Sequence, residues 1–210
     1  MRVLGLDPGT TKSAWCLVDG GVPVRWGWEA NESLRQYLSG SIKEHIRGQM
    51  LRDGTIFDVL VIEDITHYGP NISVGRDVFE TCKWMGRFDP DCTATFIPRP
   101  EIKLYLCGSP RAKDTNIRQA IIDHFGGQEK AIGGRKCETC HGSGMRGRGK
   151  ARGPCPDCSS RLSRQDEIPG TGYQTSPGVL YEFSRAGMGS HGWSALAVAL
   201  TFLGRKEVTG

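Results

Sequence analysis

Long apolar runs are missing from this 210-residue sequence. No stretch approaches the roughly 18 apolar residues of a membrane-spanning helix. The N-terminus leads at once into a short apolar strand, without the charged and apolar regions of a signal peptide. We therefore expect a protein of the cytoplasm that has no membrane partner.

Cysteines in a disulfide-like pattern are also missing. Four of the eight cysteines stand singly in apolar or mixed surroundings, as reduced cytosolic thiols usually do. These are Cys16, Cys82, Cys92 and Cys107. The other four are clustered, and in a reducing compartment such clustering indicates a metal site.

A strong overall charge is absent, since the formal net charge is only +4. The charge is nevertheless unevenly distributed along the chain. Eight basic and two acidic residues lie between Arg135 and Arg164, whereas the rest of the chain holds 19 basic and 21 acidic residues. The positive charge is therefore concentrated on one segment, which is typical of a surface that contacts a polyanion.

Large apolar residues are nearly absent from segment 136–176, which is rich in Gly, Pro and Ser. This segment cannot join a hydrophobic core, although the 38% hydrophobic content of the chain is sufficient for one core. We expect residues 1–134 and 177–210 to form one domain, with residues 135–176 inserted as a small module.

Apolar periodicity and turn residues predict the secondary structure of the main domain. The expected strands are 3–6, 13–18, 22–28, 57–62 and 93–97, and the expected helices are 31–50, 73–88, 114–125 and 190–203. A hairpin of antiparallel strands followed by alternating strands and helices indicates a mixed sheet. The order is that of an RNase H-like α/β fold, a mixed five-stranded sheet with helices on both faces.

The opening strand delivers a carboxylate to its C-terminal end. Val3–Leu6 is short and apolar, and it is followed by Asp7 and a Pro8-Gly9 turn. A carboxylate on a rigid strand end beside glycine suits a metal or phosphate site, because little side-chain bulk blocks the approach. An aspartate that merely caps a hairpin turn fits this stretch equally well.

A second carboxylate, Glu63, closes the buried strand 57–62. If the two strands are neighbours, Asp7 and Glu63 can share one or two divalent cations, and hard oxygen ligands favour Mg²⁺ or Mn²⁺. Two such ions about 3.5–4 Å apart can activate water and stabilise the leaving oxygen of a phosphodiester. Taken alone, Glu63-Asp64 could equally mark the solvent end of a strand.

The clustered cysteines form two Cys-x-x-Cys pairs, Cys137/Cys140 and Cys155/Cys158. Four thiolates at this spacing are typical of a closed tetrahedral Zn²⁺ site with a structural role. Between the pairs lie four basic residues spaced mainly by glycines: Arg146, Arg148, Lys150 and Arg152. We expect this loop to contact DNA phosphates without reading sequence.

Further motifs resemble the RuvC family of Holliday junction resolvases. The motifs are Ile102-Lys103, Cys107-Gly108-Ser109, Ala112-Lys113, Ile117-Arg118 and the terminal His191-Gly192-Trp193-Ser194-Ala195-Leu196-Ala197. Sugar kinases, actin and chaperone ATPases share an Asp-x-Gly-Thr-Thr turn, but they need two such domains, for which this chain is too short. The resemblance to RuvC covers residues 1–127 and 178–204.

The resemblance implies a set of site residues. Asp7, Glu63 and His191 would hold Mg²⁺ or Mn²⁺, and Lys113 would neutralise charge on the scissile phosphate. Ser194 stands where the family has its last aspartate, so the site has one carboxylate fewer. Asp114 and Asp64 are candidates to replace it, and we prefer Asp114 because strand alternation turns Asp64 away from Glu63.

Tyr68 follows Glu63 in a Gly/Pro/Asn loop. In the RuvC family an aromatic residue of this loop inserts at the centre of the junction, and the resemblance implies that Tyr68 has this role. A tyrosine that only packs against its own loop fits the sequence equally well.

The sequence thus predicts a divalent-metal-dependent crossover-junction endodeoxyribonuclease, of phage type, with a structural Zn²⁺. Its expected partner is branched DNA such as a four-way junction, bound by a homodimer in the cytoplasm of a bacterial host. Two alternatives stay open. One is a non-catalytic branched-DNA-binding protein that has lost the full metal site, and the other is a less selective RNase H-like nuclease.

Overall fold

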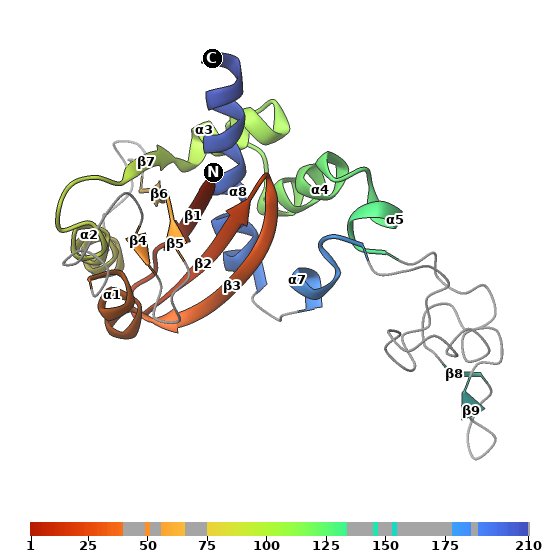
Figure 1. Ribbon diagram of the computed structural model, residues 1–210, viewed down its shortest axis with the longest axis horizontal. Helices are drawn as coiled ribbons and strands as arrows, with labels where there is room; N and C mark the ends of the chain where they lie inside the picture. Colours follow the sequence, from red (N-terminus) through yellow and green to blue (C-terminus); the bar gives the residue numbers. More distant parts are fainter. Residues whose placement is uncertain are drawn as a thin grey trace. The chain divides into compact units, whose positions relative to one another are not determined.

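A computed structural model describes residues 1–39, 49–50, 56–65, 75–133, 145–146, 153–154, 178–185 and 189–209 (Figure 1). The chain divides into two compact units, Met1–Ile121 with Gly187–Gly210, and Ile122–Ala186. The second unit begins earlier than the insertion expected from residue 135. It includes the end of helix α4 as well as the cysteine-containing segment.

The first unit is built around one sheet. Its strands are β1 (Arg2–Asp7), β2 (Lys12–Asp19), β3 (Val22–Ala30), β6 (Val59–Asp64) and β7 (Thr95–Pro98). The strand order is β3-β2-β1-β6-β7; β1 and β3 pair antiparallel with β2, whereas β6 pairs parallel with both β1 and β7. The predicted α/β fold with a mixed five-stranded sheet in RNase H-like order is confirmed.

Helices lie on both faces of this sheet, with α1 (Asn31–Ser39) and α2 (Arg76–Phe88) on one face and α8 (Gly189–Thr209) on the other. Helix α3 (Arg99–Cys107) follows β7 and packs against α8, and α4 (Asp114–His124) comes next along the chain. Strand alternation sends Leu4 and Leu6 to one face, where they join a core with residues of α1 and α2 such as Leu34 and Phe88. The opposite face of β1 carries Val3, Gly5 and Asp7, and α8 packs against β1, β2 and β6.

Two expectations about helices were wrong. The helix predicted over 31–50 does not reach its expected end, because Gln49–Met50 forms strand β4, which pairs with β5 (Ile56–Phe57). The sequence also predicts no helix directly after β7, since two prolines follow that strand. The structure places Pro98 at the N-cap of α3 and Pro100 in its first turn, where a missing N–H leaves no helical hydrogen bond unmade.

Helix α8 approaches the sheet most closely at Gly5. A Cβ atom at Gly5 would overlap the carbonyl oxygen of Ala195 and would lie 3.0 Å from the Cβ of Ala199. Ala195 and Ala199 are themselves fully buried. Small residues on both elements therefore allow the helix backbone to lie almost directly against the strand.

The second unit contains α5 (Gln128–Ala131), α7 (Tyr181–Arg185) and the short strands β8 (Met145–Arg146) and β9 (Gly153–Pro154). The N–H of Gly178 donates to the carbonyl of Ile132 at 3.2 Å, and the N–H of Leu180 donates to the carbonyl of Ala131 at 2.6 Å. These two bonds join Ala131 and Ile132 to Gly178 and Leu180 within the second unit.

The close approach at Gly5 generates a stability prediction. We expect Gly5→Ala to lower the free energy of unfolding by about 1–3 kcal/mol or more, because the added methyl group must push α8 away from β1. The measurement is chemical denaturation followed by circular dichroism. Gly86→Ala is the matched control, since Gly86 lies in α2 with open space around it. There the same change should stabilise the protein by up to about 1 kcal/mol. Equal stability of Gly5→Ala and the native protein would contradict the described packing.

Candidate metal and catalytic site

Two buried carboxylates lie at the C-terminal ends of the central parallel strands. The pairing of β1 with β6 ends at Leu6 and Ile62, so Asp7 and Glu63 follow on adjacent strands. Strand alternation directs both side chains to the α8 face. Their exposed fractions are only 9% and 8%.

The two carboxylates influence each other electrostatically. Burial, and then the negative charge of Asp7, raise the pKa of Glu63 to about 7. Arg99 opposes this shift by its charge and by a hydrogen bond. Two adjacent buried acids that resist being charged together form a site that attracts a cation.

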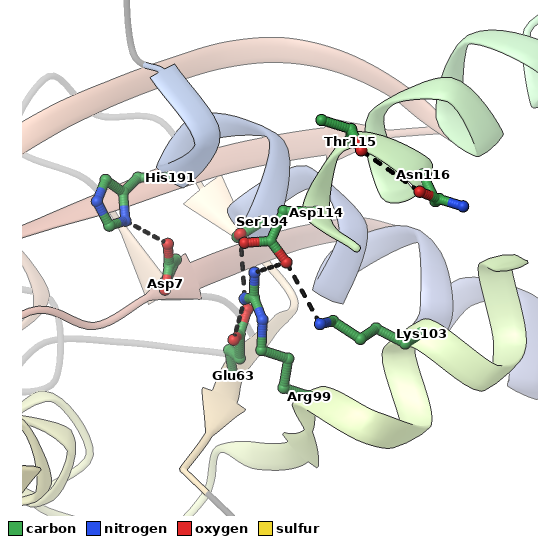
Figure 2. Close-up of polar contacts among 9 residues, drawn as sticks. All are labelled: Asp7, Glu63, Arg99, Lys103, Asp114, Thr115, Asn116, His191 and Ser194. Atoms are coloured by element: carbon green, nitrogen blue, oxygen red, sulfur yellow. Dashed lines mark hydrogen bonds and ion pairs between the residues drawn. The ribbon is translucent and has the colours of Figure 1, made fainter. Parts of the chain in front are cut away.

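The first turns of α8 supply His191 and Ser194. These residues are three positions apart, so they lie on the same side of the helix. The Nδ1 atom of His191 lies 2.9 Å from Oδ2 of Asp7, as Figure 2 shows. The hydrogen bond in which the Asp7 carboxylate accepts from His191 is the main reason that the pKa of His191 is raised above its usual value, although burial opposes the shift.

His191 is also held by an exposed tryptophan that sequence reasoning missed. The His191 ring stacks on Trp28 of β3, with ring centroids 6.1 Å apart and planes inclined by 18°. Nζ of Lys12 lies 5.2 Å from the centroid of the Trp28 ring. Asp7 pairs with Ala14 and Ala14 pairs with Trp28, so one row across three strands connects this tryptophan to the acid. Only the strand register reveals this relation.

A buried network fixes the turn after Asp7. The Ser13 hydroxyl donates to Oδ1 of Asn31 at 2.7 Å, and Nδ2 of Asn31 donates to the carbonyl of Gly9 at 2.9 Å. The N–H of Gly9 donates to the Ser13 hydroxyl oxygen at 3.2 Å. The Asp-Pro-Gly turn is therefore bound to the start of α1, which gives Asp7 a rigid support.

Arg99 is the most important residue that the sequence analysis missed. It is the first residue of α3, directly after β7. One terminal nitrogen, Nη1, contacts Oε1 of Glu63 and lies 3.2 Å from the hydroxyl of Ser194. Figure 2 shows the guanidinium group between Glu63, Ser194 and Asp114. The signal available in the sequence was a basic residue just after a strand that ends beside the acidic strand β6.

Asp114 lies on the other side of this arginine. Its Oδ1 is 2.9 Å from Nη2 of Arg99 and 3.4 Å from Nζ of Lys103. Burial raises the pKa of Asp114, but the contacts with these two cations outweigh it and leave the pKa below its usual value. Asp114, which the sequence analysis proposes as the replacement for the missing aspartate, therefore contacts Arg99, and Arg99 in turn contacts Glu63. Lys113 lies just before α4 with an exposed side chain, and Lys103 rather than Lys113 pairs with Asp114.

Several predicted site residues lie outside the described residues. These are Tyr68, Cys137, Cys140, Cys155, Cys158, Arg148, Lys150 and Arg152, while Arg146 is described only as part of β8. Their predicted roles stay predictions.

The donor chemistry fits a divalent cation. Asp7 and Glu63 offer hard oxygen ligands, and His191 offers a nitrogen ligand beside Asp7. Within the part of the chain that the structure describes, no group of three or more His, Cys, Asp or Glu residues gathers closely enough to count as a ready metal site. Instead the side chains are arranged as a His191–Asp7 pair and as a Glu63–Arg99–Asp114 chain.

Sheet order and strand-end carboxylates define an α/β protein of RNase H-like topology with an acidic site on the α8 face. No protein-family model matches the chain, and no curated protein matches it.

Solved structures with some similarity include Thermus thermophilus RuvC, at 12% identity over 100% of this chain and 97% of that chain, with a TM-score of 0.48. T. thermophilus RuvC in complex with Holliday junction substrate shows 12% identity over 100% and 96% of the two chains, with a TM-score of 0.49. Fowlpox virus resolvase in complex with substrate Holliday junction DNA shows 11% identity over 60% and 85%, with a TM-score of 0.28.

Proposed function

We propose that this protein is a divalent-metal-dependent endonuclease that cuts phosphodiesters in branched DNA, in the manner of a RuvC-like resolvase of phage type. The observation that carries the proposal is the buried pair Asp7 and Glu63 at the ends of adjacent central strands, with His191 bonded to Asp7. Nothing in the packing of a sheet requires two acids to be buried side by side, and burial disfavours the charged form of both.

The residues that would hold Mg²⁺ or Mn²⁺ are Asp7, Glu63 and His191. When bound, the ion supplies a charge that activates water and stabilises the leaving oxygen. The protein's own groups prepare this site. Arg99 lowers the pKa of Glu63 and so favours its ionised form, and Trp28 holds the His191 ring beside Asp7. Lys103 and Lys113 are the nearby cations that would attract a phosphate group.

One observation supports a second candidate function. Ser194 is buried where the resemblance calls for an aspartate, and a serine cannot supply negative charge. A protein that binds branched DNA without cutting it would tolerate this loss. A less selective nuclease of the same fold is the third candidate. Cleavage and binding assays separate the three.

The first functional prediction concerns the acid pair. We expect Asp7→Asn and Glu63→Gln to reduce cleavage of a four-way junction to the level seen in excess EDTA, while junction binding survives. Both substitutions keep the side-chain shape and remove the charge that attracts the metal. The measurement is cleavage of labelled junction and matched linear duplex with Mg²⁺, Mn²⁺ or EDTA.

Asp64→Asn is the matched control for this experiment. Asp64 adjoins Glu63 in β6, but strand alternation turns it to the opposite face of the sheet. It should therefore cleave at the native rate. Full activity of Asp7→Asn or Glu63→Gln, or of the native protein in EDTA, would contradict the proposal. Binding without any cleavage by the native protein would favour the non-catalytic candidate.

We further propose that Cys137, Cys140, Cys155 and Cys158 hold one structural Zn²⁺ in the inserted module. Structural zinc contributes most of the folding free energy of so small and apolar-poor a module. We expect about one zinc per chain by mass spectrometry of protein purified without chelator, and loss of that zinc in Cys155→Ser. Cys92→Ser removes an exposed single cysteine and should retain the zinc. Native protein that contains no zinc would reject the site.

Selectivity for branched DNA would come from a homodimer that presents two basic loops and two Tyr68 side chains. Resolution of a junction needs two nicks in symmetric strands, and two-fold symmetry supplies two active sites. Phosphate contacts alone bind any duplex, so a central wedge is required for preference.

Among the described residues no helix is long and apolar enough to span a membrane. The cytoplasm of a bacterial host is the expected location.

This proposal predicts two different binding defects. Replacing Arg146, Arg148, Lys150 and Arg152 by alanine should weaken binding to all DNAs and reduce the log–log salt slope by roughly 0.9 for each lost contact. Tyr68→Ala should instead lower the ratio of junction to duplex affinity with little change in salt slope. Competitive binding at several salt concentrations, paired with sedimentation, measures both. Equal affinity of the native protein for junction and duplex would leave a general nuclease.

A further inference from the structure

The charge balance around Arg99 raises a question about how many metal ions the site holds. Arg99 contacts three groups: Glu63 and Ser194 through Nη1, and Asp114 through Nη2. Its side chain is only 21% exposed. The guanidinium group is therefore embedded among the polar groups of the site.

The fold places the backbone of Arg99 beside the acids. Ile97 pairs with Glu63 across β7 and β6, and Arg99 follows two residues later as the first residue of α3. Ile102 of the same helix is buried in the core and anchors the helix. The start of α3 is therefore held next to the end of β6, within reach of Glu63.

Ser194 makes room for this arginine. Its side chain is buried, small and uncharged, and its hydroxyl oxygen lies 3.2 Å from Nη1. The Arg99 guanidinium stays charged at every physiological pH. Glu63 therefore already has a cation on the side that faces Ser194, whereas Asp7 is paired with His191.

We propose that Arg99 is a built-in cation that replaces one of two divalent ions, so that the site binds a single divalent ion through Asp7, Glu63 and His191. The inference rests on the proposed function, because it concerns the metal content of that site. The site holds three acids, of which Glu63 and Asp114 contact the permanent cations Arg99 and Lys103, whereas Asp7 contacts His191. The remaining negative charge is too small for two divalent ions, and two oxygen donors of Glu63 and Asp114 are already bonded to Arg99.

In this arrangement Arg99 is a positioning residue. It holds Glu63 in place, and it supplies the positive charge that a second ion would otherwise bring. Ser194 is compatible with this role of Arg99, because an aspartate at position 194 would compete with Glu63 for the same guanidinium group.

The test counts bound ions directly. Titration of the full-length, zinc-containing chain with Mn²⁺, followed by calorimetry and by electron paramagnetic resonance of free Mn²⁺, should give one site per native chain. Asp7→Asn should lose that site. The double variant Arg99→Gln/Ser194→Asp should gain a second, because it removes the resident cation and adds a carboxylate. Spin coupling between two neighbouring Mn²⁺ ions should appear in the double variant alone.

Arg118→Gln is the matched control. Arg118 also lies near α8, with its guanidinium carbon 5.0 Å from the Trp193 ring centroid, so the variant loses a nearby positive charge without touching Glu63. It should keep one site, as should Arg99→Lys, which retains the charge. Circular dichroism verifies that each variant is folded, and the native stoichiometry needs no variant at all.

The outcomes separate this inference from the proposed function. Two coupled ions in the native chain would overturn the role of Arg99 and leave the nuclease proposal intact. A folded double variant that still binds only one ion would also overturn it. One ion in a chain that binds but never cuts DNA would support the inference and contradict the nuclease. No bound ion in the native chain would contradict both.

Discussion

The contact between Gly5 and helix α8 is the constraint on which the site depends. The absence of a side chain at Gly5 lets the backbone of α8 lie against β1, with Ala195 and Ala199 facing the strand. One turn earlier the same helix carries Ser194 and His191. Because the helix cannot tilt away without opening this packing, the two side chains are delivered to the strand-end acids with little freedom. A packing rule thus fixes the geometry of a polar site.

The polar site in turn has to balance charge in a buried place. Asp7 and Glu63 are adjacent and almost fully covered, which by itself favours protonation of one of them. His191 contacts Asp7 and Arg99 contacts Glu63, so each acid has a partner that compensates for its burial. These contacts offset the cost of burying two acids that would otherwise destabilise the fold. The same logic explains why Lys103 accompanies Asp114, a partly exposed acid that faces the same arginine.

The sequence predicted those parts of the structure that depend on local pattern. Asp7 and Glu63 were found because each ends an apolar run, and the sheet order followed from the hairpin and the alternation of elements. Arg99 was missed because the prolines beside it suggested a break, whereas they begin a helix. Trp28 was missed for a different reason. Trp28 lies beside His191 only because of the register in which three strands pair, and the sequence of a single segment does not reveal that register.

Exposure shows from which side this site is open. The His191 side chain is 58% exposed and Trp28 is 49% exposed, and Lys12 lies over the same ring. On the other side Arg99, Glu63 and Ser194 are covered by α3 and α8. A ligand therefore meets aromatic rings and a cation first and the buried acids afterwards. The two halves of the site therefore differ in character: the half that faces solvent presents the rings of His191 and Trp28 with the Lys12 ammonium, and the half closed by Arg99 holds the buried carboxylate of Glu63.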